Sequence, residues 1–392
     1  MSQDQKLSRR HLLTVSAAAS GAALIGTGSA QAKAPQVPRR VLGKTKQSIP
    51  ILLLGGGMGF KAGTDPRIRL ALQHGVNYVD TARKYAGGSS ERNAASTLNR
   101  QKARKETWIT SKTPKWSARG FEQDVAISLE SMKTSWVDLY FLHGLDELGP
   151  LDDRELIRSV ESLKAAKKIR FFGFSCHGGN VAELLHAAAK RPFVDAVMFK
   201  YSFRDYGDVE LNRAIDAAHK AGVGLIAMKT QGSEAGFRDA WKKFEQAGKW
   251  NKYQAVLKAV WADERITAAV SHMDSVEQLR ENIAAALDPS TLGALEQDAV
   301  RRYAELTRPY ACRGCDHLCN PAVDAPVRIG TTLRSLMYHD SYGDSEKARR
   351  VWSELPPEAR QLGGVDFTAA SRVCPHGVDV VALMQRAAVV LA

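Results

Sequence analysis

Four cysteines near the carboxyl end have the spacing of a metal site. Cys312, Cys315 and Cys319 lie within "ACRGCDHLCNP", and Cys374 follows far downstream in "RVCPHGVDV". Closely spaced cysteines completed by a distant Cys-Pro are typical of iron–sulfur proteins, in which four thiolates hold a cluster. These four residues suffice for a single [4Fe–4S] centre.

Other uses of the thiols remain open. Four thiolates also bind zinc, and four cysteines in an oxidising compartment can form two disulfides. His317 and His376 lie close to the cysteines in the sequence and are candidates to replace a thiolate as a ligand. The fifth cysteine, Cys176, stands apart and is expected to be a buried or pocket-lining thiol.

A second set of residues combines a carboxylate, a phenol, an ammonium and an imidazole. Asp80 and Tyr85 are five residues apart, Lys112 follows "TWITS", and His143 ends "VDLYFLH". Reducing a carbonyl requires a proton donor at oxygen while hydride reaches carbon. A tyrosine hydroxyl titrates near 10, so a neighbouring cation must lower its pKa. We expect Lys112 to supply that charge and Asp80 to keep it ionised. His143 would hydrogen-bond the substrate oxygen and help relay the proton.

The elements that position these residues follow from a regular alternation between residues 50 and 287. Eight short apolar runs are separated by stretches in which apolar residues recur every three or four positions. Apolar strands linked by crossover helices predict a parallel sheet buried on both faces. Eight such units in roughly 240 residues predict a closed (β/α)8 barrel of the α/β class. The runs are 51–55, 77–81, 107–111, 137–143, 169–175, 196–202, 224–228 and 266–271.

A closed barrel is favoured over an open doubly wound sheet. The glycine-rich "LGGGMGF" lacks the G-x-G-x-x-G fingerprint of a dinucleotide-binding strand–helix turn. A barrel carries its chemistry in the loops at the carboxyl ends of its strands, so the four side chains should meet on one rim. The segment "VLGKTKQSIP" before the first strand is expected to form a hairpin that closes the opposite end.

From about Val41 to Arg308 the chain resembles the aldo-keto reductases. The similarity is most specific in "GVNYVDTARKYAGGSSERNAASTL" and continues in "WITSK", "DLYFLHG" and the cofactor-clasping "SVEQLRENIAA". It implies reduction of an aldehyde or ketone by NADP(H) or NAD(H), or the reverse oxidation of an alcohol. It also implies that Asp80, Tyr85, Lys112 and His143 form the catalytic tetrad, with Tyr85 as the acid.

The resemblance further implies a set of cofactor-binding positions, some of which depart from the family pattern. Family members hold the nicotinamide carboxamide with a Ser-Asn pair and a Gln, whereas this chain has Ser175, Cys176 and Met198. Positions that commonly carry basic residues for the 2′-phosphate are His272 and Gln278. The losses weaken the clamp, although backbone groups or water can substitute. The expected cofactor-binding residues are Ser175, Met198, Lys229, His272, Gln278, Glu281 and Asn282.

The tail, residues 309–392, resembles a mainly helical, ferredoxin-like appendage found on some aldo-keto reductases. In that appendage three further ligands precede the Cys-Pro, but Gly364, Phe367 and Ala370 occupy those positions here. The resemblance therefore implies one cluster, and with it a redox partner. The tail and the loop 144–152 are both expected to cover the mouth of the barrel.

The amino terminus has the order of a twin-arginine (Tat) signal. Arg9 and Arg10 precede a weakly apolar run, and "AQA" at 30–32 offers a cleavage site before Lys33. An ordinary Sec signal or a disordered basic tail are the alternatives. We expect a periplasmic protein with a signal at 1–32, a barrel at 33–308 and a tail at 309–392. After the signal, no apolar stretch is long enough to span a bilayer.

The chain is basic, but its positive charge is not gathered in one place. The formal charge of +13 would fall to +11 on loss of the signal, and it is spread over short clusters without interleaved aromatics. This pattern indicates a solvated surface, not a nucleic-acid site. The predicted partner is a small carbonyl or alcohol. The alternatives are an iron–sulfur electron-transfer or ligand-binding protein without hydride chemistry, and a catalytically silent exported scaffold.

Overall fold

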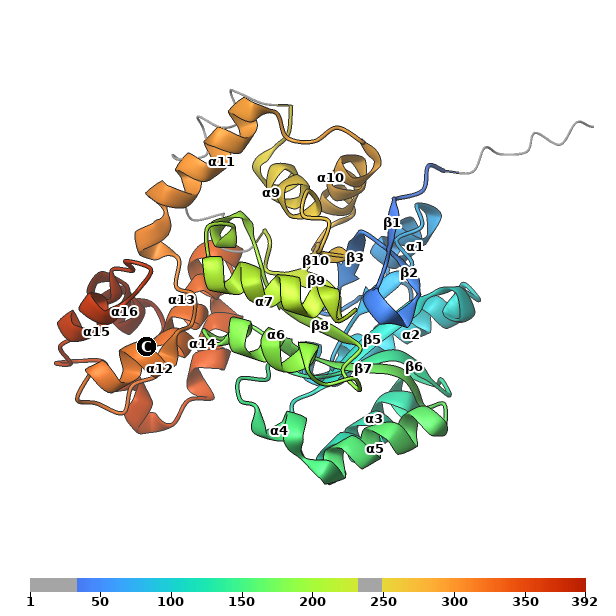
Figure 1. Cartoon of the computed structure of the whole chain (residues 1–392), viewed down its shortest axis with the longest axis horizontal. Coiled ribbons are helices and arrows are strands. Elements are labelled where there is room, and N and C mark those ends of the chain that lie inside the picture. Colours follow the sequence, from blue (N-terminus) through green and yellow to red (C-terminus); the bar gives the residue numbers. More distant parts are fainter. Residues whose placement is uncertain (1–33, 232–248) are drawn as a thin grey trace, which may run out of the picture. The chain divides into compact units, whose positions relative to one another are not determined.

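Eight parallel strands form a closed barrel, as predicted (Figure 1). The computed structural model describes residues 34–231 and 249–392. Each of the eight apolar runs overlaps one strand, and the ends agree within two residues. In order around the barrel the strands are β10 (Ala268–His272), β3 (Leu52–Gly55), β4 (Tyr78–Asp80), β5 (Trp108–Thr113), β6 (Val137–Leu142), β7 (Ile169–Cys176), β8 (Ala196–Lys200) and β9 (Gly224–Met228).

Helices surround the barrel because each crossover carries an apolar face and a defined start. Side chains at the first turn of six of them accept a backbone N–H, which satisfies donors that the helix leaves unpaired. The helices are α1 (Pro66–Gln73), α2 (Ser89–Arg100), α3 (Ala118–Met132), the short α4 (Gly149–Asp152), α5 (Arg154–Ala165), α6 (Val181–Ala189), α7 (Val209–Lys220), α9 (Lys252–Trp261), α10 (Val276–Leu287) and α11 (Ala294–Leu306).

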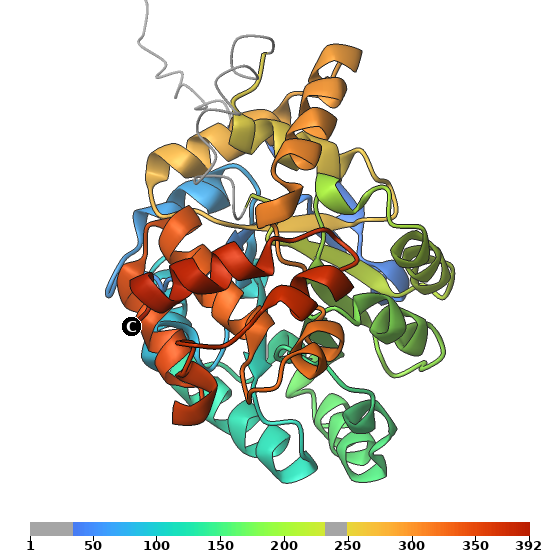
Figure 2. The same cartoon turned by 90° about the vertical axis from the view of Figure 1, so that its left-hand side faces the viewer.

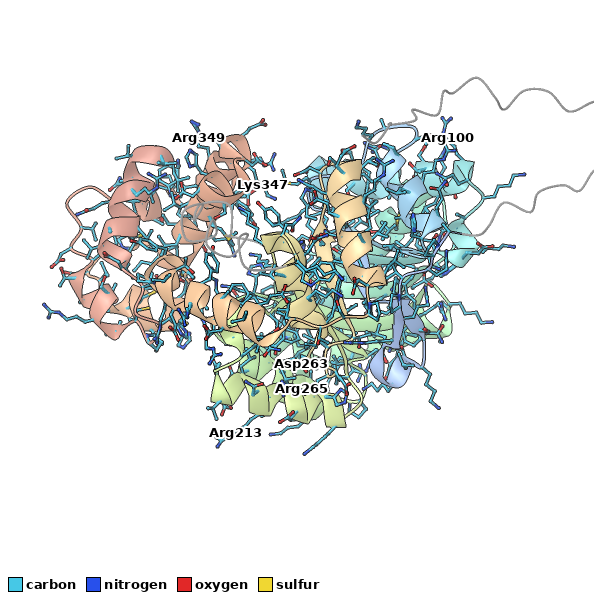
Figure 3. All side chains as sticks on the ribbon, turned by 90° about the horizontal axis from the view of Figure 1, so that it is seen from above. Arg100, Arg213, Asp263, Arg265, Lys347 and Arg349 are labelled. Atoms are coloured by element: carbon cyan, nitrogen blue, oxygen red, sulfur yellow. The ribbon has the colours of Figure 1, made fainter. Side chains whose placement is uncertain are left out.

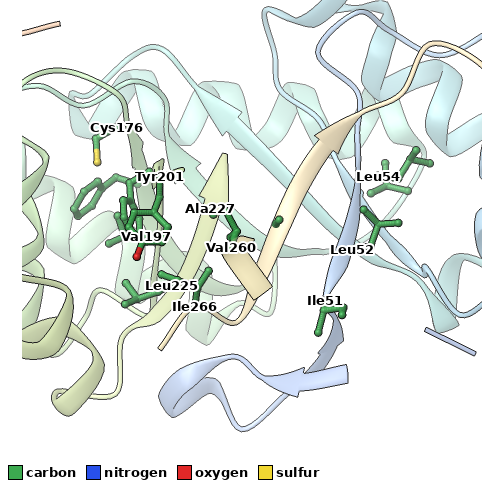
Figure 4. Packing of buried hydrophobic residues seen from close by; sticks show 14 of the residues in the cluster. Ile51, Leu52, Leu54, Cys176, Val197, Tyr201, Leu225, Ala227, Val260 and Ile266 are labelled. Atoms are coloured by element: carbon green, nitrogen blue, oxygen red, sulfur yellow. The ribbon is translucent and has the colours of Figure 1, made fainter. Parts of the chain in front are cut away.

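The strands bury both faces, which explains their continuous apolar sequences. Successive side chains on a strand point to opposite faces. Leu52 and Leu54 accordingly pack in the cluster between strands and helices, part of which is drawn in Figure 4. Leu53, between them, packs in a separate cluster inside the barrel with Tyr78 and Phe141. The inner cluster fills part of the barrel and leaves the carboxyl ends of the strands for polar residues.

The predicted hairpin is present at the amino ends of the strands. β1 (Arg39–Val41) pairs in antiparallel fashion with β2 (Ser48–Pro50). The fully buried Leu42 joins the inner cluster, and it lies so close to β9 that a Cβ on Gly224 would be 2.4 Å from Leu42 Cδ1. The hairpin therefore closes the barrel opposite the expected catalytic rim.

The carboxyl-terminal region is helical, as expected, and has a hydrophobic cluster of its own. Leu333, Trp352, Phe367 and Met384 are among the buried residues of that cluster. Figure 2 shows these helices in orange and red. They are α12 (Asp316–Cys319), α13 (Ile329–Tyr342), α14 (Ser345–Ser353), α15 (Thr368–Val373) and α16 (Val380–Val390).

The sequence predicted an export signal at the amino terminus and no membrane span after it. The predicted Tat signal at 1–32 lies outside the described residues. Within the described ranges, no helix is long and apolar enough to cross a bilayer.

Candidate active site

One cavity of about 2050 Å³ lies at the carboxyl ends of the strands. All four expected catalytic residues and all seven expected cofactor-binding residues line it, together with residues of the tail. Sites for single small molecules usually measure about 300–1,000 Å³. The cavity therefore has room for more than one ligand. The expected catalytic residues and the expected cofactor-binding residues lie together on its wall.

A buried ion pair joins the ends of β4 and β5. Lys112 Nζ donates to Asp80 Oδ1 at 2.6 Å, to Asp80 Oδ2 at 2.7 Å and to the Thr81 carbonyl at 2.8 Å. Burial raises the pKa of Asp80 and lowers the pKa of Lys112, and the attraction between the two charges opposes both shifts. The three bonds are as many as the N–H groups of an ammonium.

Tyr85 presents its ring to this pair. Lys112 Nζ lies 4.8 Å from the ring centroid, a cation–π contact. Burial raises the pKa of Tyr85 well above 10, and the negative charge of Asp80 adds to the effect. The expected lowering of the Tyr85 pKa by Lys112 is therefore wrong for this state. The physical reason is that Asp80 neutralises the ammonium and, with Thr81, engages its donors.

His143, just after β6, completes the group. Its ring meets that of Tyr85 edge to face, with centroids 5.4 Å apart. Burial, then the charges of Lys112 and Lys84, lower the pKa of His143 to about 3, so the imidazole is neutral near pH 7. His143 Nδ1 is buried and has no hydrogen-bond partner among the described residues. An unsatisfied polar atom on a cavity wall is a position for a ligand to fill.

The residues expected at the nicotinamide lie on β7 and β8. Ser175 Oγ accepts the Gly144 N–H at 3.0 Å, which leaves its own hydrogen free to donate. Met198 is almost fully buried in the inner cluster and offers the cavity only an apolar surface. Cys176 points into the outer core and does not line the cavity (Figure 4). Of the two settings expected for that thiol, the structure has the buried one.

The remaining expected cofactor residues surround the start of α10. His272, at the end of β10, contacts Asp274 Oδ1 through Nε2 at 2.5 Å, and its Nδ1 has no partner in the described part of the chain. Gln278 accepts the Asp274 N–H at 2.7 Å. Asn282 donates to Ser271 Oγ at 3.1 Å. A helix start with free N–H groups attracts anions such as phosphate.

Comparison with known proteins decides the family. Residues 61–299 match the model of the Aldo/keto reductase family. The chain belongs to this family. The matched segment contains the tetrad positions and the whole barrel except its first strand, and it ends before the tail.

Relatives and solved structures of aldo-keto reductases extend over the same region. The chain is 26% identical over 253 residues to the uncharacterized oxidoreductase YqkF of Bacillus subtilis, covering 55% of this chain and 79% of that protein. It is 24% identical to L-galactose dehydrogenase of Arabidopsis thaliana, covering 62% and 83%. The structure of aldo-keto reductase AKR11C1 from Bacillus halodurans (holo form) matches with a TM-score of 0.57 at 22% identity, covering 68% and 96%. That of aldo-keto reductase from Klebsiella pneumoniae in complex with NADPH matches with a TM-score of 0.55 at 20% identity, covering 68% and 94%.

The cysteines of the tail do not form the expected ligand set. All five cysteines lie in the described part of the chain and are free thiols, so the alternative of two disulfides is not borne out. No group of three His, Cys, Asp or Glu side chains within the described ranges is arranged to hold a metal ion. The thiols are nevertheless neighbours: burial, then the charges of Cys312 and Cys374, raise the pKa of Cys315 to about 11. Backbone N–H groups of Gly314 and Val378 donate to Cys312 and Cys374 sulfurs at 3.4 Å.

The segment 312–315, here called the cysteine loop, contacts the barrel next to the candidate active site. Lys200 Nζ, at the end of β8, donates to the Cys312 carbonyl at 2.8 Å. Gly179 N–H donates to the Gly314 carbonyl at 2.7 Å. Gly179 approaches so closely that a Cβ there would lie 2.4 Å from Cys315 Cα. The expectation that the tail reaches the barrel mouth is confirmed, because tail residues line the cavity.

Sequence reasoning missed three residues that face the tetrad. His177 lines the cavity two positions after Ser175, so the alternation of the strand was a usable signal for it. Arg334 and Tyr338 line the cavity from α13. Nothing in the tail sequence indicates which face of this helix turns to the barrel, because that depends on how the tail packs.

Proposed function

We propose that the protein reduces the carbonyl of a small aldehyde or ketone with NADP(H) or NAD(H), or catalyses the reverse oxidation. The observation that carries the proposal is the Asp80–Lys112 ion pair facing the Tyr85 ring, with His143 at its edge, in one large cavity. Membership of the aldo-keto reductases supports the reaction class. The NADPH complex of the Klebsiella pneumoniae protein supports the choice of cofactor.

The residues present suit a nicotinamide cofactor in most respects. When bound, the cofactor supplies the hydride. His272 Nδ1 and the start of α10 would hold its phosphates. Gln278, Glu281 and Asn282 lie on the same helix. Ser175 can donate to the carboxamide, whereas Met198 supplies no hydrogen bond, so we expect weaker holding of the nicotinamide than a Gln would give.

Tyr85 is the proposed proton donor. Its O–H bond breaks as the proton moves to the substrate oxygen, while hydride adds to the carbonyl carbon. The raised pKa keeps Tyr85 protonated before the reaction. Lys112 contacts the ring of Tyr85 and so helps to hold this side chain in place during the transfer. Neutral His143 donates a hydrogen bond to the substrate oxygen and orients it. Tyr85 regains a proton from water at the cavity mouth.

The direct test is aldehyde-dependent oxidation of NADPH and NADH by the purified full chain. Turnover of at least one member of a panel of small aldehydes and ketones is expected. Tight binding of NADPH without turnover of any member, in either direction, would instead favour a ligand-binding or scaffold role.

For the tail, we propose that the four cysteines hold one metal centre, a [4Fe–4S] cluster or zinc. The motif spacing and the mutual effect of the thiols on their pKa values support this, but the side chains are not arranged as a ligand set. No step of the reaction is assigned to such a centre. Anaerobic purification with iron, sulfide and zinc analysis tests it. A visible absorption that dithionite bleaches and NADPH does not would favour electron transfer without hydride chemistry.

We also propose export to the periplasm by the Tat route, as the twin arginines indicate. Replacement of both Arg9 and Arg10 by lysine should retain the protein in the cytoplasm. Fractionation that finds the unaltered chain in the cytoplasm would contradict export.

A further inference from the structure

Two cations from different parts of the chain line the active-site cavity. Arg334 projects from α13 of the tail, and its Nη1 lies 3.4 Å from His177 Nδ1. Lys229 directly follows β9 of the barrel. Both line the same cavity as the tetrad.

Neither cation has a carboxylate partner in the described part of the chain. No ion pair joins Arg334 or Lys229 to an acidic group among the described residues. Asp316 is near enough for the charge of Arg334 to lower its pKa, yet burial raises that pKa more strongly and Asp316 accepts the Gly330 N–H instead. Two other acids on the cavity wall are already paired, Asp80 with Lys112 and Asp340 with Arg386.

The charges of Lys229 and Arg334 also lower the pKa of the expected catalytic histidine, His143. After burial, the groups that lower the pKa of His143 are led by four cations, two of which are Lys229 and Arg334. Lys229 itself has its pKa lowered well below 10.5, by burial and then by Arg334. Two like charges held near one another in a partly buried site are destabilising unless an anion binds between them.

The backbone at Lys229 is also unusual. Its φ is +58°, in the left-handed region that residues with a Cβ rarely adopt. Such strain persists where the surrounding structure imposes it, and it gathers at functional sites. The lysine is therefore held at this position on the cavity wall at a conformational cost.

Helix α13 carries Arg334 and also a residue that lies near the catalytic tyrosine. Tyr338 lies four residues after Arg334, so the two side chains share one face of the helix. Tyr338 is near enough to Tyr85 for its charge to raise the pKa of that residue.

We propose that the carbonyl substrate carries an anionic group, a carboxylate or a phosphate, which binds between Arg334 and Lys229 while the carbonyl reaches Tyr85 and His143. This rests on the proposed function. Arg334 is a specificity residue that the tail supplies to the barrel. A guanidinium suits either anion, because its N–H groups match two oxygens at once.

Matched pairs of substrates test the proposal on the full chain. The first pair is 4-carboxybenzaldehyde and benzaldehyde, and the second is glyceraldehyde 3-phosphate and glyceraldehyde. The pair with the larger preference for its charged member distinguishes a carboxylate from a phosphate. In Arg334→Leu the ratio of kcat/KM, charged over neutral, should fall roughly 10- to 100-fold. Lys229→Met should act in the same direction.

Arg349→Leu is the matched control, because Arg349 is an exposed arginine on α14 outside the cavity (Figure 3). It should leave the ratio unchanged. A ratio that Arg334→Leu leaves unchanged would overturn the proposal. So would equal losses for charged and neutral substrates with weakened NADPH binding, since the cations would then hold cofactor phosphates.

Calorimetry separates this proposal from the proposed function. If no aldehyde is turned over, binding of terephthalate and of the neutral terephthalamide can still be compared. Tighter binding of terephthalate that Arg334→Leu abolishes would sustain the anion site while the reductase proposal fails. Equal binding of the two compounds would overturn the anion site.

Discussion

Lys112 Nζ lies 2.6 and 2.7 Å from the two carboxylate oxygens of Asp80, in a site where the lysine side chain is only 1% exposed. Neutralised in this way, the ammonium holds Tyr85 in place through its ring and does not lower the pKa of the free phenol. Lys112 is therefore a positioning group for Tyr85, and burial leaves the phenol a weak acid.

Removing one partner of this pair should be costly. Asp80→Asn leaves a buried lysine without a counter-charge, and we expect a loss of about 3–5 kcal/mol in the free energy of unfolding. Asp80→Asn combined with Lys112→Met should recover part of that loss, because no uncompensated charge remains, but should not recover carbonyl turnover. Urea denaturation of the single and double variants measures both effects. Additive losses in the double variant would show that the pair is not coupled.

His143 should make stability depend on pH in a defined direction. Its pKa falls from 6.5 to about 3 on folding. Above pH 6.5 the imidazole is neutral in the folded and in the unfolded chain, so its full contribution to the free energy of unfolding is present. As the pH falls from 6.5 toward 3 the unfolded chain binds a proton that the folded chain does not, and stability is lost.

Urea midpoints measured between pH 4 and 8 check this expectation. His143→Gln should flatten the decline, whereas His219→Gln, on the exposed end of α7, should not. Turnover should show no break near pH 6.5 from His143. Identical pH dependence in the unaltered chain and His143→Gln would refute the assigned pKa.

Gly179 should control how the cysteine loop sits on the barrel. In Gly179→Ala the new Cβ would fall 2.4 Å from Cys315 Cα, a backbone atom that cannot turn away. We expect a loss of about 1–3 kcal/mol, as for other overpacked sites, and faster proteolysis in the tail. Gly207→Ala, where a Cβ meets nothing within 4 Å, is the control. Equal protease sensitivity of the two variants would show that this contact does not hold the tail.

The barrel and the meeting of the tetrad were predictable because both follow from local patterns. Runs such as Leu52–Gly55 are apolar on both faces, and parallel strands must bring Asp80, Lys112 and His143 to one rim. The raised pKa of Tyr85 was not predictable, since it depends first on how deeply the phenol is buried and then on how near Asp80 lies. The position of Arg334 on the cavity wall was also not predictable, because it depends on how α13 packs against the barrel and not on the sequence of the helix.

The cysteines of the tail were predicted as candidate ligands, but their geometry was not. The spacing of Cys312, Cys315 and Cys319 identifies candidate ligands. Cys312 and Cys315 do lie near Cys374, and Cys319 lies near Cys312 and Cys315. Their spacing does not fix the directions of the sulfur atoms. Those directions depend on the packing of α12 and α15, which no short motif encodes.

Substitution of Tyr85 by phenylalanine tests the central claim most directly. The change removes one hydroxyl and keeps the ring that contacts Lys112 and His143, so folding and NADPH binding should be retained. With the best aldehyde of the panel, kcat should fall by about 10²–10⁴-fold, while Tyr206→Phe, outside the cavity, stays at the level of the unaltered chain. Unchanged turnover in Tyr85→Phe would contradict the account.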